Sequence, residues 1–297
     1  MMLYAIRHVT RFEYAQPAGF SRCNLRLQPI LWSGQETLDY SLSIEPGGKV
    51  SPARAEAGLA NVVRLVVETR TRSLSIESVA RVRVERPIPF PQPSDPTLAE
   101  VARLARESMD IGAASPASYI FPSPLIPLDP DIAAWCAEDL DPGRGVLDAI
   151  FALAFRIQHE FDFDTKATLV DTPPREAFEK RGGVCQDFAQ IMISGLRAAG
   201  LPAAYASGYL RTLPPPGQPR LVGADATHAW VLIWAGPDLG WVGVDPTNGI
   251  WMAEDHIIVA IGRDYSDIAP IDGIVLGSGA QEMNVSVDVE PLQEAVV

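Results

Sequence analysis

A proline-rich segment divides this chain and limits what its two sides can form. Residues 85–97 read ERPIPFPQPSDPT. Proline lacks a backbone N–H and fixes φ, so this segment can continue neither a central strand nor a helix interior. The charge also changes here: residues 1–93 hold 12 Lys or Arg and 8 Asp or Glu, whereas residues 94–297 hold 12 and 29. We therefore expect two units of different character, joined by a boundary or a packed linker.

Antiparallel β structure is predicted for the first domain, residues 1–93. Apolar and polar residues alternate in short runs, which is the period of a strand with one solvated face. The runs cover residues 3–14, 38–44, 62–69 and 74–84. Arginines on the polar side allow either a binding face or a solvated face, and the solvated face is the commoner arrangement.

Residues 94–140 are predicted to be a proline-rich connecting segment. Within it, residues 97–108 have the pattern of a short helix. Residues 116–130 are too apolar for a free linker, so we expect them to form an ordered strap along the second domain. That domain, residues 141–297, begins with an amphipathic helix predicted at 146–157.

A cysteine at a predicted helix start is the first candidate for chemistry. A glycine pair precedes Cys185, and apolar residues then recur at helical spacing as far as Gly200. A helix N-terminus stabilises an anion, which favours a thiolate, and the N–H groups of Cys185 and Gln186 are placed to bind an oxyanion. Asp187 opposes the thiolate, and free cysteines are usually buried small hydrophobes. Catalytic and structural roles both remain open.

A histidine and an aspartate follow on a predicted β-hairpin. Residues 227–234 and 241–245 have strand composition and flank a turn-forming loop. If the strands pair symmetrically about this loop, the numbers of paired residues sum to 475. His228 then faces Thr247 and shares its face with Asp245, its diagonal neighbour at roughly 7 to 8 Å between Cα atoms. A register slip of one residue would separate the two side chains.

Together, these residues supply what cysteine acyl transfer requires. A thiolate attacks a carbonyl, an imidazole moves the proton, and a carboxylate orients the imidazole. A structural alternative exists for each: His228 as a satisfied core histidine, and residues 245–249 as a turn favoured by their composition.

Three motifs resemble those of a known family. GGVCQDFA, ADATHAW and GWVGVDPTNG are similar to the Cys, His and Asp motifs of the bacterial transglutaminase-like proteins, relatives of papain-like cysteine enzymes. The similarity extends over nearly the whole chain. The start, RHVTRFEYAQPAGFSRCNLRLQP, resembles the family's N-terminal β domain, and EDHIIVAIGRDYSDIAPIDG resembles the segment after the catalytic Asp.

The resemblance implies an α+β fold with an N-terminal antiparallel β domain and a papain-like transglutaminase core. In that core the nucleophile helix packs on an antiparallel sheet, and residues 141–297 form the catalytic domain. It also implies that Cys185 is the nucleophile, His228 the general base and acid, and Asp245 the orienting carboxylate.

Two departures from the family concern the oxyanion. No tryptophan occurs between Trp135 and Trp230, where animal cross-linking transglutaminases have one that helps to hold the oxyanion. The sequence FDF at residues 161–163 stands where members of the bacterial group often have a tyrosine in an FxY segment. The backbone N–H groups of Cys185 and Gln186 remain the expected donors. No DxDxDG loop supports calcium control.

The composition of the chain limits the binding partners and the location that we expect. A net charge of -13 disfavours nucleic acid and anionic membranes, and no apolar run is long enough for a signal peptide or a membrane span. Three dispersed cysteines fit no disulfide framework, so we expect a cytoplasmic protein with Cys23 and Cys136 structural. The other histidines, at positions 8, 159 and 256, lack metal-ligand spacing, and no metal or cofactor is predicted. The oligomeric state is left open.

The predicted function is cysteine-dependent hydrolysis of peptide or isopeptide amide bonds through a thioester. The alternatives are a transamidase, which transfers the acyl group to an amine, and a catalytically silent binding or assembly module. We expect a peptide or protein substrate, with Trp230 and Asp225 in its binding site. The tryptophans at 230, 234 and 241 can line a groove, although two of the three are expected in the core. Residues 213–220 form either a cleft wall or a plain surface loop.

Overall fold

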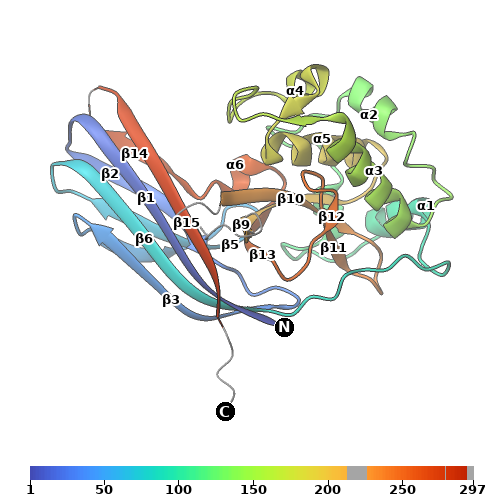
Figure 1. Cartoon of the computed structure of the whole chain (residues 1–297), viewed down its shortest axis with the longest axis horizontal. Coiled ribbons are helices and arrows are strands. Elements are labelled where there is room, and N and C mark those ends of the chain that lie inside the picture. Colours follow the sequence, from blue (N-terminus) through green and yellow to red (C-terminus); the bar gives the residue numbers. More distant parts are fainter. Residues whose placement is uncertain (213–225, 278, 293–297) are drawn as a thin grey trace, which may run out of the picture.

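Two antiparallel sheets and a layer of helices make up the protein. The structure is a computed structural model, and it describes residues 1–212, 226–277 and 279–292. One sheet has four strands and the other has nine. Figure 1 shows the helices gathered at one end of the molecule, away from the free ends of the long strands. The predicted α+β class is confirmed.

The four-stranded sheet has the order β15, β1, β6, β3. Strand β6 alternates as predicted: Ile76 and Val82 are buried, whereas Arg81 and Arg83 are exposed and ion-paired with acids of β3. This row of arginines is a solvated face. The strands are β1 (Met2–Ala18), β3 (Gln35–Glu45), β6 (Thr71–Val84) and β15 (Gln281–Leu292).

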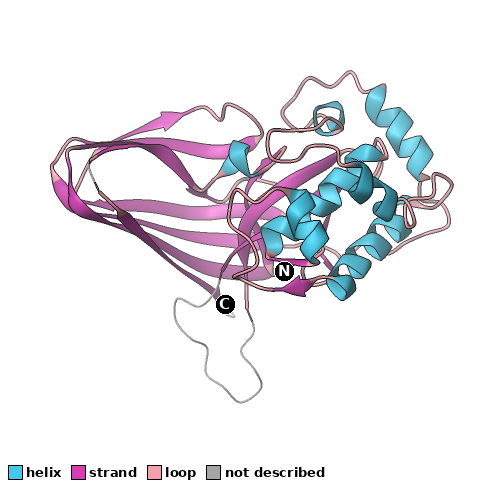
Figure 2. Ribbon diagram, turned by 90° about the horizontal axis from the view of Figure 1, so that it is seen from above, coloured by secondary structure: helices cyan, strands magenta, loops and turns pink. Residues whose placement is uncertain are grey.

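The nine-stranded sheet runs through both halves of the molecule. Its order is β12, β11, β10, β9, β13, β5, β2, β14, with β4 added on β5. Strands β2 and β5 pack against the four-stranded sheet around Leu25, Leu65 and Leu74, and Figure 2 shows the two layers. The strands are β2 (Phe20–Gln28), β4 (Lys49–Ala53), β5 (Leu59–Val67), β9 (Ala203–Leu210), β10 (Ala226–Trp234), β11 (Trp241–Asp245), β12 (Ile250–Trp251), β13 (His256–Gly262) and β14 (Ile271–Leu276).

The helices cover the β9 to β11 part of this sheet. Helix α5 (Cys185–Ala198) packs on β9 and β10, is almost wholly buried, and ends before Gly200, whose φ of +77° suits glycine. A short parallel pair, β7 (Asp162–Phe163) and β8 (Gly182–Gly183), leads into it. The other helical elements are α1 (Leu98–Arg106), η1 (Pro116–Tyr119), α2 (Pro130–Cys136), α3 (Val146–Glu160), α4 (Pro174–Lys180) and α6 (Tyr265–Ile268).

The hairpin that carries the histidine and the aspartate has the predicted register. Val231 lies opposite Val244 and Trp234 lies opposite Trp241, so the numbers of paired residues sum to 475. His228 and Asp245 therefore share one face of the sheet, because side chains alternate along each strand.

Strand pairing departs from the predicted division at residues 93 and 140. Strand β14 pairs with β2 and β15 pairs with β1, so residues 271–292 belong with the N-terminal strands and not with the rest of 141–297. Residues 94–140 are more than a connector, because Val101 of α1 and Ile132 of α2 are fully buried in the helical core. Sequence periodicity indicates a strand but not its partner, which explains the difference.

No helix in the described ranges combines the length and the apolar character that crossing a membrane requires.

The place of β15 can be tested by a matched pair of substitutions. Val289 is fully buried between the two sheets, whereas Val285 on the same strand is 46% exposed. We expect Val289→Ser to lower the free energy of unfolding by about 2 kcal/mol, because it removes apolar contacts and buries a hydroxyl. Val285→Ser should change it by less than about 0.5 kcal/mol. Denaturant titration measures both, and equal small effects would contradict this placement.

Candidate active site

Cys185 is the first residue of α5 and is partly exposed. The first N–H groups of a helix have no acceptor within it, so those of Cys185 and Gln186 point away from the intrahelical hydrogen bonds. The other two cysteines differ: Cys23 and Cys136 are buried, and burial raises the pKa of both thiols. Only Cys185 has the exposure that a nucleophile needs.

Asp187 caps the start of α5. Its Oδ2 accepts hydrogen bonds from the Val184 N–H at 2.8 Å and the Thr168 hydroxyl at 2.6 Å. Burial raises the pKa of this carboxyl, which is only 1% exposed. Gly183 makes room for the cap, since a Cβ there would lie 2.5 Å from Asp187 Oδ2. This side chain is therefore committed to the helix and does not face solvent beside the thiol.

The His228 ring is held by Asp245 and is influenced by Cys185. Its Nε2 lies 2.8 Å from Asp245 Oδ2, and Cys185 is close enough to the ring to raise its pKa. Because Asp245 occupies Nε2, the nitrogen that remains for Cys185 is Nδ1. The predicted hydrogen bond between the carboxylate and one ring nitrogen is present, and the contact of the thiol with the other nitrogen stays a prediction.

Asp245 is a fully buried carboxylate at the end of β11. Its Oδ1 accepts from the backbone N–H groups of Thr247 (2.9 Å) and Asn248 (3.2 Å). Its Oδ2 accepts from the Asn248 side chain (2.6 Å), His228 (2.8 Å) and His256 (3.2 Å). Burial alone would raise the pKa of Asp245, but the hydrogen bonds from the two histidines hold it well below its usual value. The carboxylate therefore stays ionised.

The electrostatics favour a charged His228. Burial alone would lower the pKa of its imidazole, but the hydrogen bonds and negative charges of Asp245 and Cys185 outweigh burial and hold this pKa well above its usual value. An imidazolium held between a carboxylate and a thiol is suited to form an ion pair with a thiolate.

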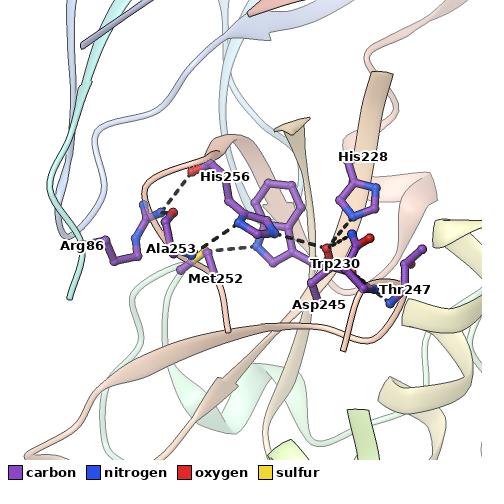
Figure 3. A network of polar contacts seen from close by, with 9 residues as sticks. Arg86, His228, Trp230, Asp245, Thr247, Met252, Ala253 and His256 are labelled. Atoms are coloured by element: carbon purple, nitrogen blue, oxygen red, sulfur yellow. Dashed lines mark hydrogen bonds and ion pairs between the residues drawn. The ribbon is translucent and has the colours of Figure 1, made fainter. Parts of the chain in front are cut away.

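Two residues of this network were missed by the sequence analysis. Figure 3 shows His256 on the side of Asp245 away from His228, with Trp230 nearby. Asn248 was recognised only as part of a turn. The signal for His256 was weak, because it is a lone histidine at the start of a buried strand, and β13 lies beside β9 rather than beside β10 or β11.

Of the two expected substrate-binding residues, Trp230 is described by the structure and Asp225 is not. Trp230 is wholly buried, so its assignment to the substrate site was wrong. Its indole Nε1–H points to Met252 Sδ at 3.1 Å, and its ring stacks near His228 and meets His256 edge-on. Trp230 therefore packs against both histidines. Asp225 and residues 213–220 lie outside the described residues.

Three side chains of the network are potential metal ligands. His228, Asp245 and His256 each offer one ligand atom, and these atoms all lie within 4.8 Å of one another. Two imidazoles and a carboxylate form a donor set that suits transition metals. Here Asp245 Oδ2 accepts a hydrogen bond from each ring, so the three groups satisfy one another. The expected absence of a metal stays a prediction.

Comparison with known proteins places the fold and the motifs in a family. Residues 134–246 match the transglutaminase-like superfamily, and residues 4–83 match the bacterial transglutaminase-like N-terminal region. An uncharacterized protein of Mycobacterium tuberculosis is 34% identical over 98% of this chain and 93% of its own length. The chain belongs to the transglutaminase-like superfamily, and within it to the bacterial proteins that carry this N-terminal region.

Of two further similarities, one covers a short segment and the other concerns the fold. A protein-glutamine gamma-glutamyltransferase of Pseudomonas aeruginosa is 41% identical over 102 residues, which are 33% of this chain and 15% of that protein. A crystal structure of a candidate cysteine protease from Cytophaga hutchinsonii superposes with a TM-score of 0.75 at 21% identity, covering 100% of this chain and 92% of that one. At this identity the second similarity concerns the fold.

The charge on His228 can be tested by neutralising its partner. We expect Asp245→Asn to lower the pKa of His228 markedly, because burial lowers this pKa and the carboxylate is a main cause that raises it. A pH titration of the His228 ring resonances by NMR measures the shift. Asp148→Asn, on the exposed surface of α3, is the control. An unchanged His228 pKa in Asp245→Asn would contradict this electrostatic account.

Proposed function

We propose that this protein hydrolyses amide bonds of peptide or protein substrates through a thioester on Cys185. One observation carries the proposal: the buried Asp245 carboxylate holds the His228 ring through Nε2 at 2.8 Å, and Cys185 at the start of α5 acts on the same ring. A thiol, an imidazole and a buried carboxylate in this order are what nucleophilic acyl transfer requires. The bond attacked is a peptide or isopeptide amide.

In the first half-reaction, the Cys185 thiolate attacks the amide carbonyl carbon. The developing oxyanion receives hydrogen bonds from the backbone N–H groups of Cys185 and Gln186, aided by the positive end of α5. His228, already protonated, passes its Nδ1 proton to the leaving nitrogen as the C–N bond breaks. The products are a thioester on Cys185, a free amine and a neutral imidazole.

In the second half-reaction, water resolves the thioester. Neutral His228 takes a proton from the attacking water, and the C–S bond breaks to release a carboxylic acid. Asp245 holds the ring through Nε2 in both steps and stabilises the imidazolium that forms. Because its own carboxylate accepts five hydrogen bonds, Asp245 is too weak a base to remove that proton.

Transamidation is the second candidate, and it shares the first half-reaction. The segment shared with the gamma-glutamyltransferase of Pseudomonas aeruginosa favours it. An amine acceptor must compete with water for the thioester, which calls for a site that desolvates and guides the amine. Asp187, a nearby carboxylate, is occupied in capping α5 and is unsuited to guide an amine. We therefore favour water as the acceptor.

A catalytically silent binding module is the third possibility. A buried carboxylate and a buried imidazole are costly to keep in a fold unless they are paired, as they are here. Such pairing also serves stability alone, so only turnover separates the module from the enzyme.

The competition between water and an amine tests the proposal. We expect a glutamine-containing peptide, supplied together with a millimolar primary amine, to yield mainly the free acid, as measured by mass spectrometry. Cys185→Ala should abolish both products, whereas Cys23→Ala should leave them largely unchanged. A dominant amine conjugate at low amine concentration would favour the transamidase. Equal product from Cys185→Ala and the wild type would reject the triad.

A further inference from the structure

His256 makes two hydrogen bonds that define its tautomer. Its Nδ1 accepts from the Ala253 N–H at 3.4 Å, so the ring proton lies on Nε2. That Nε2–H donates to Asp245 Oδ2 at 3.2 Å, on the same oxygen that binds His228. Burial lowers the pKa of His256, which is 1% exposed. The ring is therefore a neutral donor that adds no charge to the site.

Arg86 fixes the turn that carries His256. Its Nη1 donates to the carbonyl oxygens of Ala253 and His256, each at 3.0 Å (Figure 3). The His256 N–H closes the same turn on the Ala253 carbonyl at 3.2 Å. Strand β6 ends at Val84, two residues before Arg86, so a residue of the N-terminal half sets the backbone that aims the His256 ring.

We propose that His256 is a positioning residue that holds Asp245 Oδ2 against His228, and that Arg86 fixes His256 in place from the N-terminal half of the chain. This inference rests on the proposed function. The order of contact is Arg86, the 253–256 turn, His256, Asp245, His228 and Cys185. The N-terminal half therefore takes part in building the active site.

Two effects follow from the His256 donor. First, it restricts the position of Asp245 Oδ2. Apart from His228 itself, the other donor to this oxygen is the Asn248 side chain, so the loss of His256 would leave Oδ2 less constrained. Second, the His256 donor makes Asp245 a weaker base, so the shared proton stays on His228. In the described part of the chain, the charged and titratable groups that act on His256 are Asp245 of β11, His228 of β10 and Arg86. Those that act on His228 are Asp245 and Cys185 of α5.

A matched pair of substitutions separates positioning from folding. His256→Gln places an amide N–H where Nε2–H donates to Asp245, whereas His256→Asn places its polar atoms near Nδ1, toward the Ala253 N–H. Both variants are neutral, polar and of similar size. We measure alkylation of Cys185 by iodoacetamide from pH 5 to 9, following the Cys185 peptide by mass spectrometry. This readout needs no substrate, so it tests the positioning even if the proposed amidase activity is wrong.

We expect His256→Asn to slow alkylation at pH 6 about tenfold, because one hydrogen bond to a charged group is lost and Asp245 then holds the His228 imidazolium less well beside the thiol. The alkylation rate of His256→Gln at pH 6 should stay within about threefold of the wild-type rate. In the hydrolysis assay, His256→Asn should lower kcat and leave KM nearly unchanged. Equal pH profiles for the two variants, or an unchanged His256→Asn, would overturn the proposal.

The contribution of Arg86 is tested by a double-mutant cycle. Arg86→Met should reduce Cys185 alkylation in the same direction, and adding it to His256→Asn should cause little further loss, because both act on one contact. Arg83→Met, at the exposed ion pair with Glu36, is the control and should have no effect. Thermal unfolding of each variant reports folding separately. Losses from Arg86→Met and His256→Asn that simply add would show that Arg86 does not act through His256.

Discussion

The Asp245 carboxylate is the group on which the site depends. It is fully buried, and five hydrogen bonds from the turn after β11, from β10 and from β13 converge on it. Without these donors the buried Asp245 carboxylate would take up a proton. His228 would then lose the negative charge that stabilises its protonated form. The register of the β10–β11 hairpin is therefore a condition of the chemistry, because a slip of one residue would move Asp245 to the other face of the sheet.

The two halves of the chain share one sheet, so the site is not the property of a separable catalytic domain. Strand β13, which begins with His256, pairs with β9 on one side and with β5 of the N-terminal half on the other. Strands β14 and β15 return to β2 and β1. Arg86 then reaches from the end of β6 to the turn before β13. Through this continuous sheet and the Arg86 contacts, the N-terminal half is linked physically to the Asp245 carboxylate.

Local patterns in the sequence were enough to predict the parts of the site that depend on neighbours along the chain. Helix α5 begins at Cys185, and the hairpin register followed from symmetric pairing about a short loop. Long-range partners were out of reach. The pairing of β15 with β1 and the approach of His256 to Asp245 depend on sheet order, which periodicity does not encode. Trp230 was misassigned because alternation gives a face, and both faces of β10 are buried.

The central claim is that Cys185 forms an acyl-enzyme, and intact-mass spectrometry tests it directly. The protein is mixed with a peptide library and quenched in acid, which preserves thioesters. The account predicts a mass increase equal to one acyl fragment, located on Cys185 and released by hydroxylamine. Cleavage of the peptides with no adduct on Cys185, or the same adduct on a Cys185→Ala protein, would contradict it.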